Sequence, residues 1–354
     1  MQFGRMHPGK ILVRATNWVG DAVMSVPALQ ALRDAYPSAQ IAILARPWVA
    51  GLYGREPFCD ELIPYEASKG WQGLAKKWRL ANELRNRKFD LAILFPNAFE
   101  AAALVWLAQI PVRIGYSRDA RGPFLTHAIS VPRTGQTPPH QRFYYLELLK
   151  RAAVIESYEG SNAIRLSGAC AAAEQGRKRL RLSFGTSAVL GVSPGAAYGG
   201  AKRWLPERFA EAAIHIARER DAAVAVFGSA EELAICQRVR AQIDSAGVKS
   251  HNFAANTSVA EFIELAAACD LFLTNDSGPM HIASALGVPV VAVFGATDDV
   301  ETGPTGDSSR VVRHPVECSP CLLRECPIDH RCMTGVSAAL VTDVANTLVR
   351  ISKK

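Results

Sequence analysis

Short apolar runs of strand length recur along this chain, and each is followed by a stretch with helical spacing. In the first half they lie at residues 11–14, 41–45, 91–95 and 111–115. In the second half they lie at 189–193, 222–227, 250–253, 270–273, 289–294 and 310–312. Continuous apolar strands that alternate with helices are typical of a parallel sheet covered by helices on both faces. Two such series predict two doubly wound, Rossmann-like α/β domains.

The segment 165–188 separates the two series and has the pattern of a polar helix followed by a loop. We therefore place an N-terminal domain at residues 1–167 and a C-terminal domain at 185–354. The stretch "SAALVTDVANTLVRI" near the C-terminus is amphipathic, and its helix could pack back on the N-terminal domain. Open parallel sheets bind ligands at the carboxyl ends of their strands, so we expect the active site in a cleft between the domains.

The stretch "TNDSGPMHIA" follows the apolar run 270–273 and contains a turn and a helix start. We expect this helix to begin near Pro279, because proline at a first helical position loses no hydrogen bond. Free N–H groups at a helix start attract phosphate. The candidate ligand-binding residues of this turn are Asp276, Ser277, Gly278, Met280 and His281. The alternative is a helix capped by Ser277 or Asp276 with nothing bound.

A second strand-end loop, "GVSPGAAYGGAKRW", is rich in glycine and alanine and ends in a Lys-Arg pair. Small residues let an anion approach the backbone, and an ammonium group there supplies a charge to it. Ser193, Gly195 and Lys202 are therefore candidate phosphate-binding residues, and the alternative is a flexible loop with solvated cations. No GxGxxG sequence follows the first strand of either series, which disfavours a nicotinamide or flavin enzyme.

The third loop, "RATNWVGDAVMSVP", follows the run 11–14 and leads into a helical pattern. A carboxylate at a strand end facing the cleft can serve as a general base, which makes Asp21 the catalytic candidate. The alternative is that Asp21 caps the helix, since aspartate is among the best N-cap residues. Pro27 predicts a kink in this helix or a short first turn.

The basic residues are concentrated in the first half of the chain. Residues 1–150 hold 19 Lys and Arg against 11 Asp and Glu, whereas the whole chain carries a net charge of +7. This distribution indicates an anionic partner, such as an acidic lipid surface or a phosphorylated substrate, or else a solvated basic face without a partner. Aromatic content is only 8%, and basic and aromatic residues do not interleave, so nucleic-acid binding is disfavoured.

No run approaches the roughly 20 apolar residues of a membrane span, and the N-terminal stretch lacks the layout of a signal peptide. We therefore expect a cytoplasmic protein. The basic segment 68–88 carries Trp71 and Trp78, which could contact an anionic lipid surface. The alternative is a domain surface with two half-buried tryptophans.

The three strand-end loops together resemble the signature segments of glycosyltransferase family 9, the heptosyltransferases. The resemblance rests on "VRATNWVGDAVMSVPALQAL", "SPGAAYGGAKRWLPERFAE" and "TNDSGPMHIASALGVPVVAVFGATD", and it extends over roughly residues 10–350 in the expected order. It implies a GT-B-like fold with an N-terminal acceptor domain, a C-terminal nucleotide-sugar (donor) domain and a central cleft. It also implies inverting transfer of L-glycero-D-manno-heptose from ADP-heptose to the heptosyl-Kdo inner core of lipopolysaccharide.

The resemblance assigns roles to the candidate residues. Asp21 would take the proton of the acceptor hydroxyl, and Lys202 with the amides around Ser277, Gly278, Met280 and His281 would stabilise the departing ADP. Asp276 would bind heptose hydroxyls, because its carboxylate would be repelled by the negatively charged phosphates of the donor. A leaving group stabilised in this way needs no catalytic metal. Further candidates are Asn97, Arg118 and Arg121 for the acceptor, because guanidinium binds phosphate and carboxylate, and Glu231 for the ribose.

The partners implied are ADP-heptose, a phosphorylated Kdo-lipid A core acceptor and peripheral contact with the anionic inner face of the inner membrane. The alternatives are heptosyltransferase I, another family 9 sugar transferase, a sugar-nucleotide epimerase, or a catalytically silent module that binds nucleotide sugars. The basic first half counts against an epimerase, which has no acceptor to hold. The presence of Asp21 together with Lys202 counts against a binding module, which needs no base.

Four of the eight cysteines cluster near the C-terminus, at Cys318, Cys321, Cys326 and Cys332. Disulfides are disfavoured in a reducing cytoplasm. Four thiolates within fifteen residues, beginning with C-x-x-C, could close a tetrahedral structural zinc site. The alternative is a set of reduced, partly buried thiols.

Overall fold

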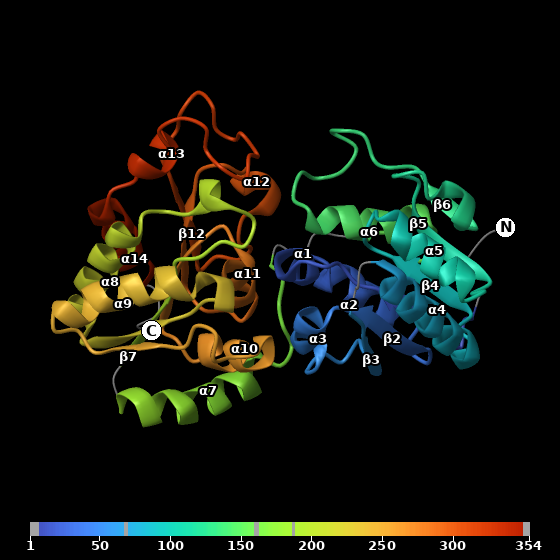
Figure 1. The fold of residues 1–354 in the computed structure, drawn as a ribbon, viewed down its shortest axis with the longest axis horizontal. Helices are drawn as coiled ribbons and strands as arrows, with labels where there is room; N and C mark the ends of the chain where they lie inside the picture. Colours follow the sequence, from blue (N-terminus) through green and yellow to red (C-terminus); the bar gives the residue numbers. More distant parts are fainter. Residues whose placement is uncertain (1–6, 67–69, 159–162, 186–187, 350–354) are drawn as a thin grey trace. The chain divides into compact units, whose positions relative to one another are not determined.

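The computed structural model describes residues 7–66, 70–158, 163–185 and 188–349. The chain divides into two compact units, Met1–Ser161 and Asn162–Lys354, which we call unit 1 and unit 2. Each unit is built around one six-stranded sheet (Figure 1). No helix in the described ranges is long and apolar enough to cross a membrane.

The sheet of unit 1 is entirely parallel. Its strand order is β3-β2-β1-β4-β5-β6, so the chain reverses its direction of travel across the sheet between β1 and β4. Side chains alternate between the two faces of a strand, and Ile11, Leu12 and Val13 of β1 are all buried because helices cover both faces. The strands are β1 (Lys10–Arg14), β2 (Gln40–Ala45), β3 (Glu61–Pro64), β4 (Leu91–Leu94), β5 (Val112–Tyr116) and β6 (His127–Ile129).

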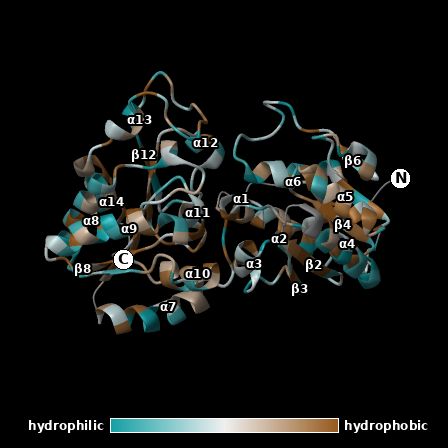
Figure 2. Cartoon of the chain, viewed as in Figure 1, coloured by the Kyte–Doolittle hydropathy of each residue, from teal (hydrophilic) through white to brown (hydrophobic). Residues whose placement is uncertain are grey.

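Two groups of helices cover this sheet. The first group, packed on one another, is α1 (Val19–Met24), α2 (Val26–Ala35), α3 (Pro47–Tyr53) and α6 (Arg142–Arg151). The second is α4 (Gly70–Arg87) and α5 (Phe99–Leu107), whose Leu84 and Val105 share a core with Leu12 and Leu44. Figure 2 shows hydrophobic residues gathered along the strands and α5, whereas α4 carries much hydrophilic colour. The short turn η2 (Gly122–Phe124) connects β5 to β6 and contacts α5.

The sheet of unit 2 repeats the same topology. Its order is β12-β11-β10-β7-β8-β9, again all parallel, with the reversal between β7 and β10. The strands are β7 (Ala188–Ser193), β8 (Ala222–Val226), β9 (Ser250–Asn252), β10 (Leu271–Asn275), β11 (Val290–Phe294) and β12 (Ser309–Arg313). Ligands of such sheets bind at the carboxyl ends of the strands beside the reversal.

The helices of unit 2 also form two layers. One layer contains α8 (Pro206–Arg220), α9 (Leu233–Ser245) and α14 (Ala338–Val349), and the other contains α7 (Ala169–Phe184), α10 (Val259–Ala267) and α11 (Gly278–Ala285). Helices α7 and α10 touch at Gly176, where an added Cβ would lie 1.8 Å from the carbonyl oxygen of Glu264. Short helical turns fill the loops: η3 (Gly200–Lys202), η4 (Ala230–Glu232), α12 (Asp299–Thr302) and α13 (Arg331–Thr334).

The C-terminal amphipathic stretch forms a helix, α14, as its pattern predicted. Its buried residues Val341, Ala345 and Leu348 join the core beneath α8, and the helix also contacts β11 and β12. The structure therefore packs this helix within unit 2. The segment 165–188 contains the predicted polar helix, α7, and its residues 186–187 lie outside the described ranges.

All ten strands predicted from the apolar runs are present, most within one or two residues of the predicted bounds. The sequence pattern missed β3 and β6. Both are short, and each is an edge strand of its sheet whose residues are only partly buried. A half-exposed strand of three or four residues lacks the continuous apolar run by which the others were predicted.

Candidate functional site

The centre of the site in unit 2 is an ion pair between two strand-end loops. Nζ of Lys202, in the loop after β7, donates to Oδ2 of Asp276, after β10, at 2.6 Å. The Thr297 hydroxyl donates to the same carboxylate oxygen at 2.5 Å. The side chains of Lys202 and Asp276 are only 14% and 4% exposed. Because one carboxylate occupies one of its three N–H donors, the ammonium is held in place with donors left for a ligand.

Asn275 ties these loops together beneath the ion pair. Its side-chain amide donates to the carbonyl oxygens of Pro194 and Gly195 at 2.8 and 3.2 Å, and its Oδ1 accepts from the backbone N–H of Trp204 at 2.9 Å. The Trp204 indole is fully buried and donates to the carbonyl of Val336 at 3.1 Å. The loop that carries Lys202 is thus fixed on both sides. The residues on either side of Asn275 were predicted as ligand-binding residues, but Asn275 itself was not.

The helix start at α11 presents unpaired amides. The helix begins at Gly278, with Pro279 in its first turn, close to the predicted start. Ser277 is the N-cap residue, as the capped-helix alternative expected, but its hydroxyl donates to the Asn275 carbonyl at 3.2 Å and no side chain makes a capping hydrogen bond. Among the described residues, neither the Gly278 nor the Met280 N–H has an acceptor. Two open amides at a helix N-terminus form an anion site.

A buried carboxylate, that of Glu232, lies against the first part of the loop that carries Lys202. Glu232 is buried and closes a capping box, in which its side chain accepts from the Ser229 N–H at 2.9 Å. It lies so close to Gly195 that an added Cβ would sit 2.2 Å from its Oε1. The predicted ribose ligand, Glu231, is exposed. The sequence signal that distinguishes the two is the S-x-x-E spacing of the box.

The cysteine-rich segment, residues 318–332, supports the Lys202 loop from outside. The Ala201 N–H donates to the Arg324 carbonyl at 2.9 Å, the Gly200 N–H donates to Oε1 of Glu325 at 2.9 Å, and the Tyr198 hydroxyl donates to the Leu322 carbonyl at 2.9 Å. At Gly199 an added Cβ would lie 2.2 Å from the Arg324 carbonyl oxygen. Only glycine allows this close approach of the two backbones.

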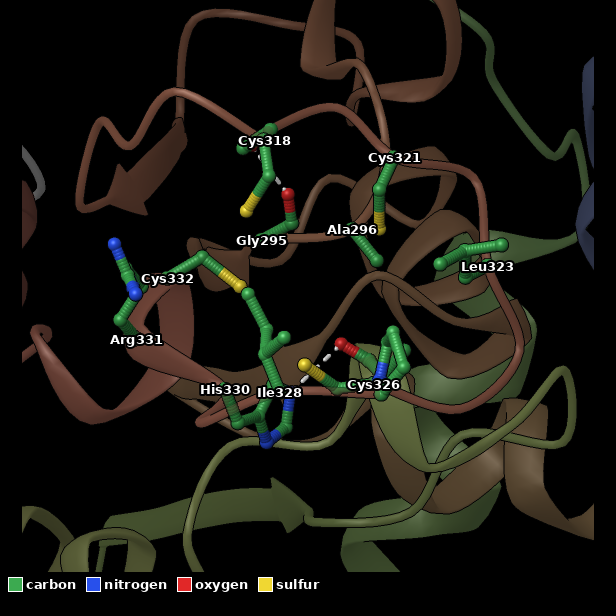
Figure 3. Close-up of a pocket in the computed structure, with 13 residues that line it drawn as sticks. Gly295, Ala296, Cys318, Cys321, Leu323, Cys326, Ile328, His330, Arg331 and Cys332 are labelled. Carbon is green, nitrogen blue, oxygen red and sulfur yellow. Dashed lines mark hydrogen bonds between the residues drawn. The ribbon is translucent and has the colours of Figure 1, made fainter.

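A pocket of about 80 Å³ lies within this segment (Figure 3). The four cysteines line it together with His330, and all four are free thiols. In the ranges that the structure covers, no three His, Cys, Asp or Glu side chains are arranged to hold a metal ion. The zinc hypothesis therefore gains no ligand set from this geometry, and it stays a prediction. Those thiols are Cys318, Cys321, Cys326 and Cys332.

In unit 1, Asp21 lies in the first turn of α1, beyond the carboxyl end of β1. It is not the N-cap, which is Trp18. The helix ends at Met24, and α2 begins at Val26 with Pro27 in its first turn, so the predicted short first turn is confirmed. The Asp21 charge raises the pKa of the buried Tyr53 and Tyr145 hydroxyls, after the larger effect of their burial.

The three predicted acceptor residues follow β4 and β5 but differ in exposure. Arg121 is fully buried, donating to the Tyr116 carbonyl at 2.8 Å, to the Pro96 carbonyl and to Asn97 Oδ1 at 3.1 Å. Arg121 therefore joins the loop after β4 to the end of β5. Arg118 is exposed, 3.8 Å from the Asp119 carboxylate. Acceptor contact by Asn97, Arg118 and Arg121 stays a prediction.

Comparison with known proteins gives one family. The model of glycosyltransferase family 9 (heptosyltransferase) matches residues 77–331. The lipopolysaccharide heptosyltransferase 2 of Salmonella typhimurium is 31% identical over 308 residues, which cover 86% of this chain and 88% of that protein. The lipooligosaccharide heptosyltransferase 2 of Campylobacter jejuni is 26% identical over 345 residues, covering 97% of this chain and 99% of that protein.

Among solved structures, the ADP-heptose lipopolysaccharide heptosyltransferase II of E. coli matches with a TM-score of 0.81 at 28% identity. The match covers 98% of this chain and all of that one. This likeness confirms the predicted GT-B-like α/β fold class.

Proposed function

The chain belongs to glycosyltransferase family 9, and we propose that it transfers heptose from ADP-heptose to the heptosyl-Kdo inner core of lipopolysaccharide. The relatives named heptosyltransferase 2 support this activity. The observation that carries it is the site of unit 2, where a largely buried ammonium and two open helix amides lie beside a loop of small residues. A site with these groups suits a nucleoside diphosphate better than a neutral ligand.

We propose that the diphosphate of the donor lies between α11 and Lys202. As the bond from the anomeric carbon to the phosphate oxygen breaks, the electron pair leaves with ADP and negative charge grows on the phosphates. The Gly278 and Met280 amides and the Lys202 ammonium are already in place, so they stabilise that charge without reorganising. These groups supply the positive charge that the leaving group needs, so the proposal includes no catalytic metal.

Asp276 and Glu232 complete the proposed donor site. Asp276 holds Lys202 through one oxygen, and its other oxygen is available for heptose hydroxyls. Glu232 is packed against Gly195 at the carboxyl edge of the sheet, so we place the ribose hydroxyls there and not at the exposed Glu231. A carboxylate accepts hydrogen bonds from two neighbouring hydroxyls, which is the pattern that a ribose presents.

We propose Asp21 as the general base. Its carboxylate takes the proton of the acceptor hydroxyl while that oxygen bonds to the anomeric carbon on the face opposite to ADP. One displacement of this kind inverts the anomeric configuration. Burial raises the pKa of the Tyr53 and Tyr145 phenols and keeps them protonated, so neither is proposed as the base.

The predicted contact with an anionic membrane surface is kept as part of the proposal. In α4, Leu74 and Trp78 are 58% and 59% exposed, and they lie four residues apart on one side of the helix. Lys76 and Lys77 lie between them. Residues 68–69 and the side chain of Trp71, which belong to the predicted segment, lie outside the described part. Exposed apolar side chains flanked by lysines are typical of a helix at a lipid interface.

The test is release of ADP from ADP-heptose, with and without mono-heptosylated Kdo-lipid A, by the wild type and by Asp21→Asn. We expect acceptor-dependent release that falls by about a thousandfold or more in the variant, while ADP binding is retained, since general-base catalysis contributes about 10²–10⁴-fold. Asp34→Asn is the matched control, because Asp34 lies on the neighbouring α2 and, among the described residues, bonds only to Gln30 of its own helix.

Three outcomes separate the parts of the proposal. Release that persists in Asp21→Asn would remove Asp21 as the base and leave the activity in place. Tight ADP binding without release would keep the donor site and refute this sugar or this acceptor. Failure to bind ADP at all would refute the assignment of the loops around Lys202.

A further inference from the structure

Two arginines and an aromatic ring follow three adjacent strands of unit 1. Arg14 ends β1, Arg46 follows β2, and Tyr65 follows β3. The strands are parallel neighbours, so their carboxyl ends lie at one edge of the sheet. The guanidinium carbons of both arginines lie 4.6 Å from the centroid of the Tyr65 ring. None of these three residues was predicted as a site residue from the sequence.

Arg14 is a buried cation that no carboxylate neutralises. It is 4% exposed, and its guanidinium donates to the Ala15 carbonyl, to Asn17 Oδ1 at 2.7 Å and to the Tyr65 hydroxyl. No described carboxylate forms an ion pair with it. Burial and the nearby Arg46 charge lower the pKa of Arg14 to about 10, although Tyr65 opposes this. Burying an uncompensated charge is costly, so it points to a ligand of opposite charge.

Arg46 has unused hydrogen-bond donors beside this buried charge. Its guanidinium rests on the rings of Tyr65 and Trp48, at 4.6 and 5.9 Å from their centroids, and donates to no described residue. The side chain is half-buried. Helix α3 starts right after Arg46 and is anchored on α1 by the Tyr53 hydroxyl, which donates to the Ala22 carbonyl at 3.1 Å. A fixed guanidinium with free donors is suited to bidentate binding of a carboxylate or phosphate.

Aromatic faces and the loop to Asp21 border the same edge. The Trp48 indole is 51% exposed and donates to the Asn17 carbonyl at 2.9 Å, and Trp18 is equally exposed. The flat apolar face of a pyranose stacks well on an indole. In this loop the buried Thr16 hydroxyl has no hydrogen-bond partner in the described part of the chain. The loop ends at Trp18, and Asp21 follows in the first turn of α1.

We propose that this edge is a subsite for an acidic sugar of the acceptor, with Arg46 binding the anionic group and the exposed indoles stacking on the sugar ring. Arg14 is a positioning residue: it orients Tyr65 and Asn17 through hydrogen bonds, and its buried positive charge adds to the attraction for an anion. This inference rests on the proposed function for the identity of the acceptor, whose core carries both carboxylate and phosphate groups. Glu100, the carboxylate whose charge also acts on Arg14, is occupied by Lys77 at 3.4 Å.

The test compares the acceptor KM of the wild type, Arg46→Ala and Arg46→Lys. Losing one charge-assisted, bidentate contact should raise the acceptor KM by about 10–100-fold in Arg46→Ala, with the donor KM unchanged and partial recovery in Arg46→Lys. Arg85→Ala is the matched control, because it removes an exposed guanidinium near the start of β4, at the opposite edge of the sheet. The same assays with a dephosphorylated acceptor and with a carboxyl-reduced acceptor identify the anionic group: only its removal should weaken the wild type and leave Arg46→Ala unaffected.

Calorimetric titration with a soluble sugar acid, its carboxyl-reduced analogue and a sugar phosphate gives a readout that does not need turnover. Binding of an anionic probe that Arg46→Ala abolishes, in a chain that transfers no heptose, would keep the subsite and refute the proposed function. Normal turnover with an unchanged acceptor KM in Arg46→Ala would refute the subsite and keep the function. An equal rise of the donor and acceptor KM would also refute it, because a subsite for the acceptor alone cannot produce that result.

Discussion

The pairing of Lys202 with Asp276 makes a quantitative prediction about stability. At 2.6 Å, and with an effective dielectric constant of about 20, the two charges attract by about 6 kcal/mol before the cost of removing them from water. Breaking a buried pair by removing one partner costs about 3–5 kcal/mol. The Thr297 hydroxyl stays bonded to the carboxylate, so we expect Lys202→Met to fall at the lower end, about 3 kcal/mol.

The double variant Lys202→Met/Asp276→Asn removes both charges and should cost no more than Lys202→Met alone. Asp276→Asn alone leaves the ammonium without its partner and should also cost about 3 kcal/mol, so we expect the two substitutions to be coupled by about 3 kcal/mol. The measurement is guanidinium unfolding of the full chain followed by circular dichroism, with hydrogen exchange of the β10 amides as a check that unit 2 is the part affected.

The matched control is a solvent-exposed ion pair of the same unit. Lys178 and Glu174 lie 3.0 Å apart on α7 with side chains 62% and 65% exposed, and such a pair contributes only about 0.3–0.5 kcal/mol. A coupling for Lys202 and Asp276 no larger than that of this control would refute the reasoning. It would mean that the ammonium is not held by the carboxylate in solution and is not preset for a diphosphate.

Three further predictions follow from the geometry. Gly199→Ala should abolish ADP binding, because its Cβ would lie 2.2 Å from a carbonyl oxygen of the cysteine-rich segment and displace the Lys202 loop. The double variant Leu74→Ser/Trp78→Ser should bind anionic lipid vesicles at least several-fold more weakly, as co-sedimentation would measure, with heptose transfer to a detergent-dispersed acceptor unchanged. A thiol reagent at pH 8 should modify the exposed Cys318 rapidly and leave Cys269 unmodified in the folded chain, because burial raises the pKa of the Cys269 thiol and keeps it protonated.

Controls are available for the glycine, α4 and cysteine predictions. Gly54→Ala, whose Cβ would meet only a Leu62 methyl at 4.0 Å, should be neutral, and ADP binding by Gly199→Ala would show that the loop can yield. Vesicle binding that survives the α4 substitutions would place membrane contact elsewhere. Mass spectrometry locates the modified thiols, and early labelling of Cys269 would contradict its buried position.

The fold was largely predictable because its strands are buried on both faces. The runs 11–14 and 270–273 are continuously apolar for that reason, and the alternation with helices then allows few topologies. The short edge strands β3 and β6 lack such a continuous apolar run and were not predicted. In β3, glutamate and proline flank only two apolar residues, since only one side of the strand is paired and its ends are exposed.

The site was predictable in its positions but not in its pairings. Strand-end loops identified Lys202 and Asp276, yet the sequence suggested that the lysine meets phosphate and gave no sign that it already binds the aspartate, because the two are 74 residues apart. Glu231 and Glu232 are adjacent in the sequence, and only the capping box that Glu232 forms with Ser229 shows which of them is buried. Arg46 escaped notice because nothing in "LARPWV" shows that its guanidinium lacks a partner.

The burial of Trp204 has a spectroscopic consequence. Of six tryptophans in the chain, five precede residue 162 and Trp204 alone belongs to unit 2. Its indole lies in a dry core two residues beyond Lys202, and its backbone is bonded to Asn275 at the end of β10. Replacing the other five with phenylalanine would leave one blue-shifted emitter next to the loop that carries Lys202. Such a chain would report occupancy of that loop by its intrinsic fluorescence, without any attached dye.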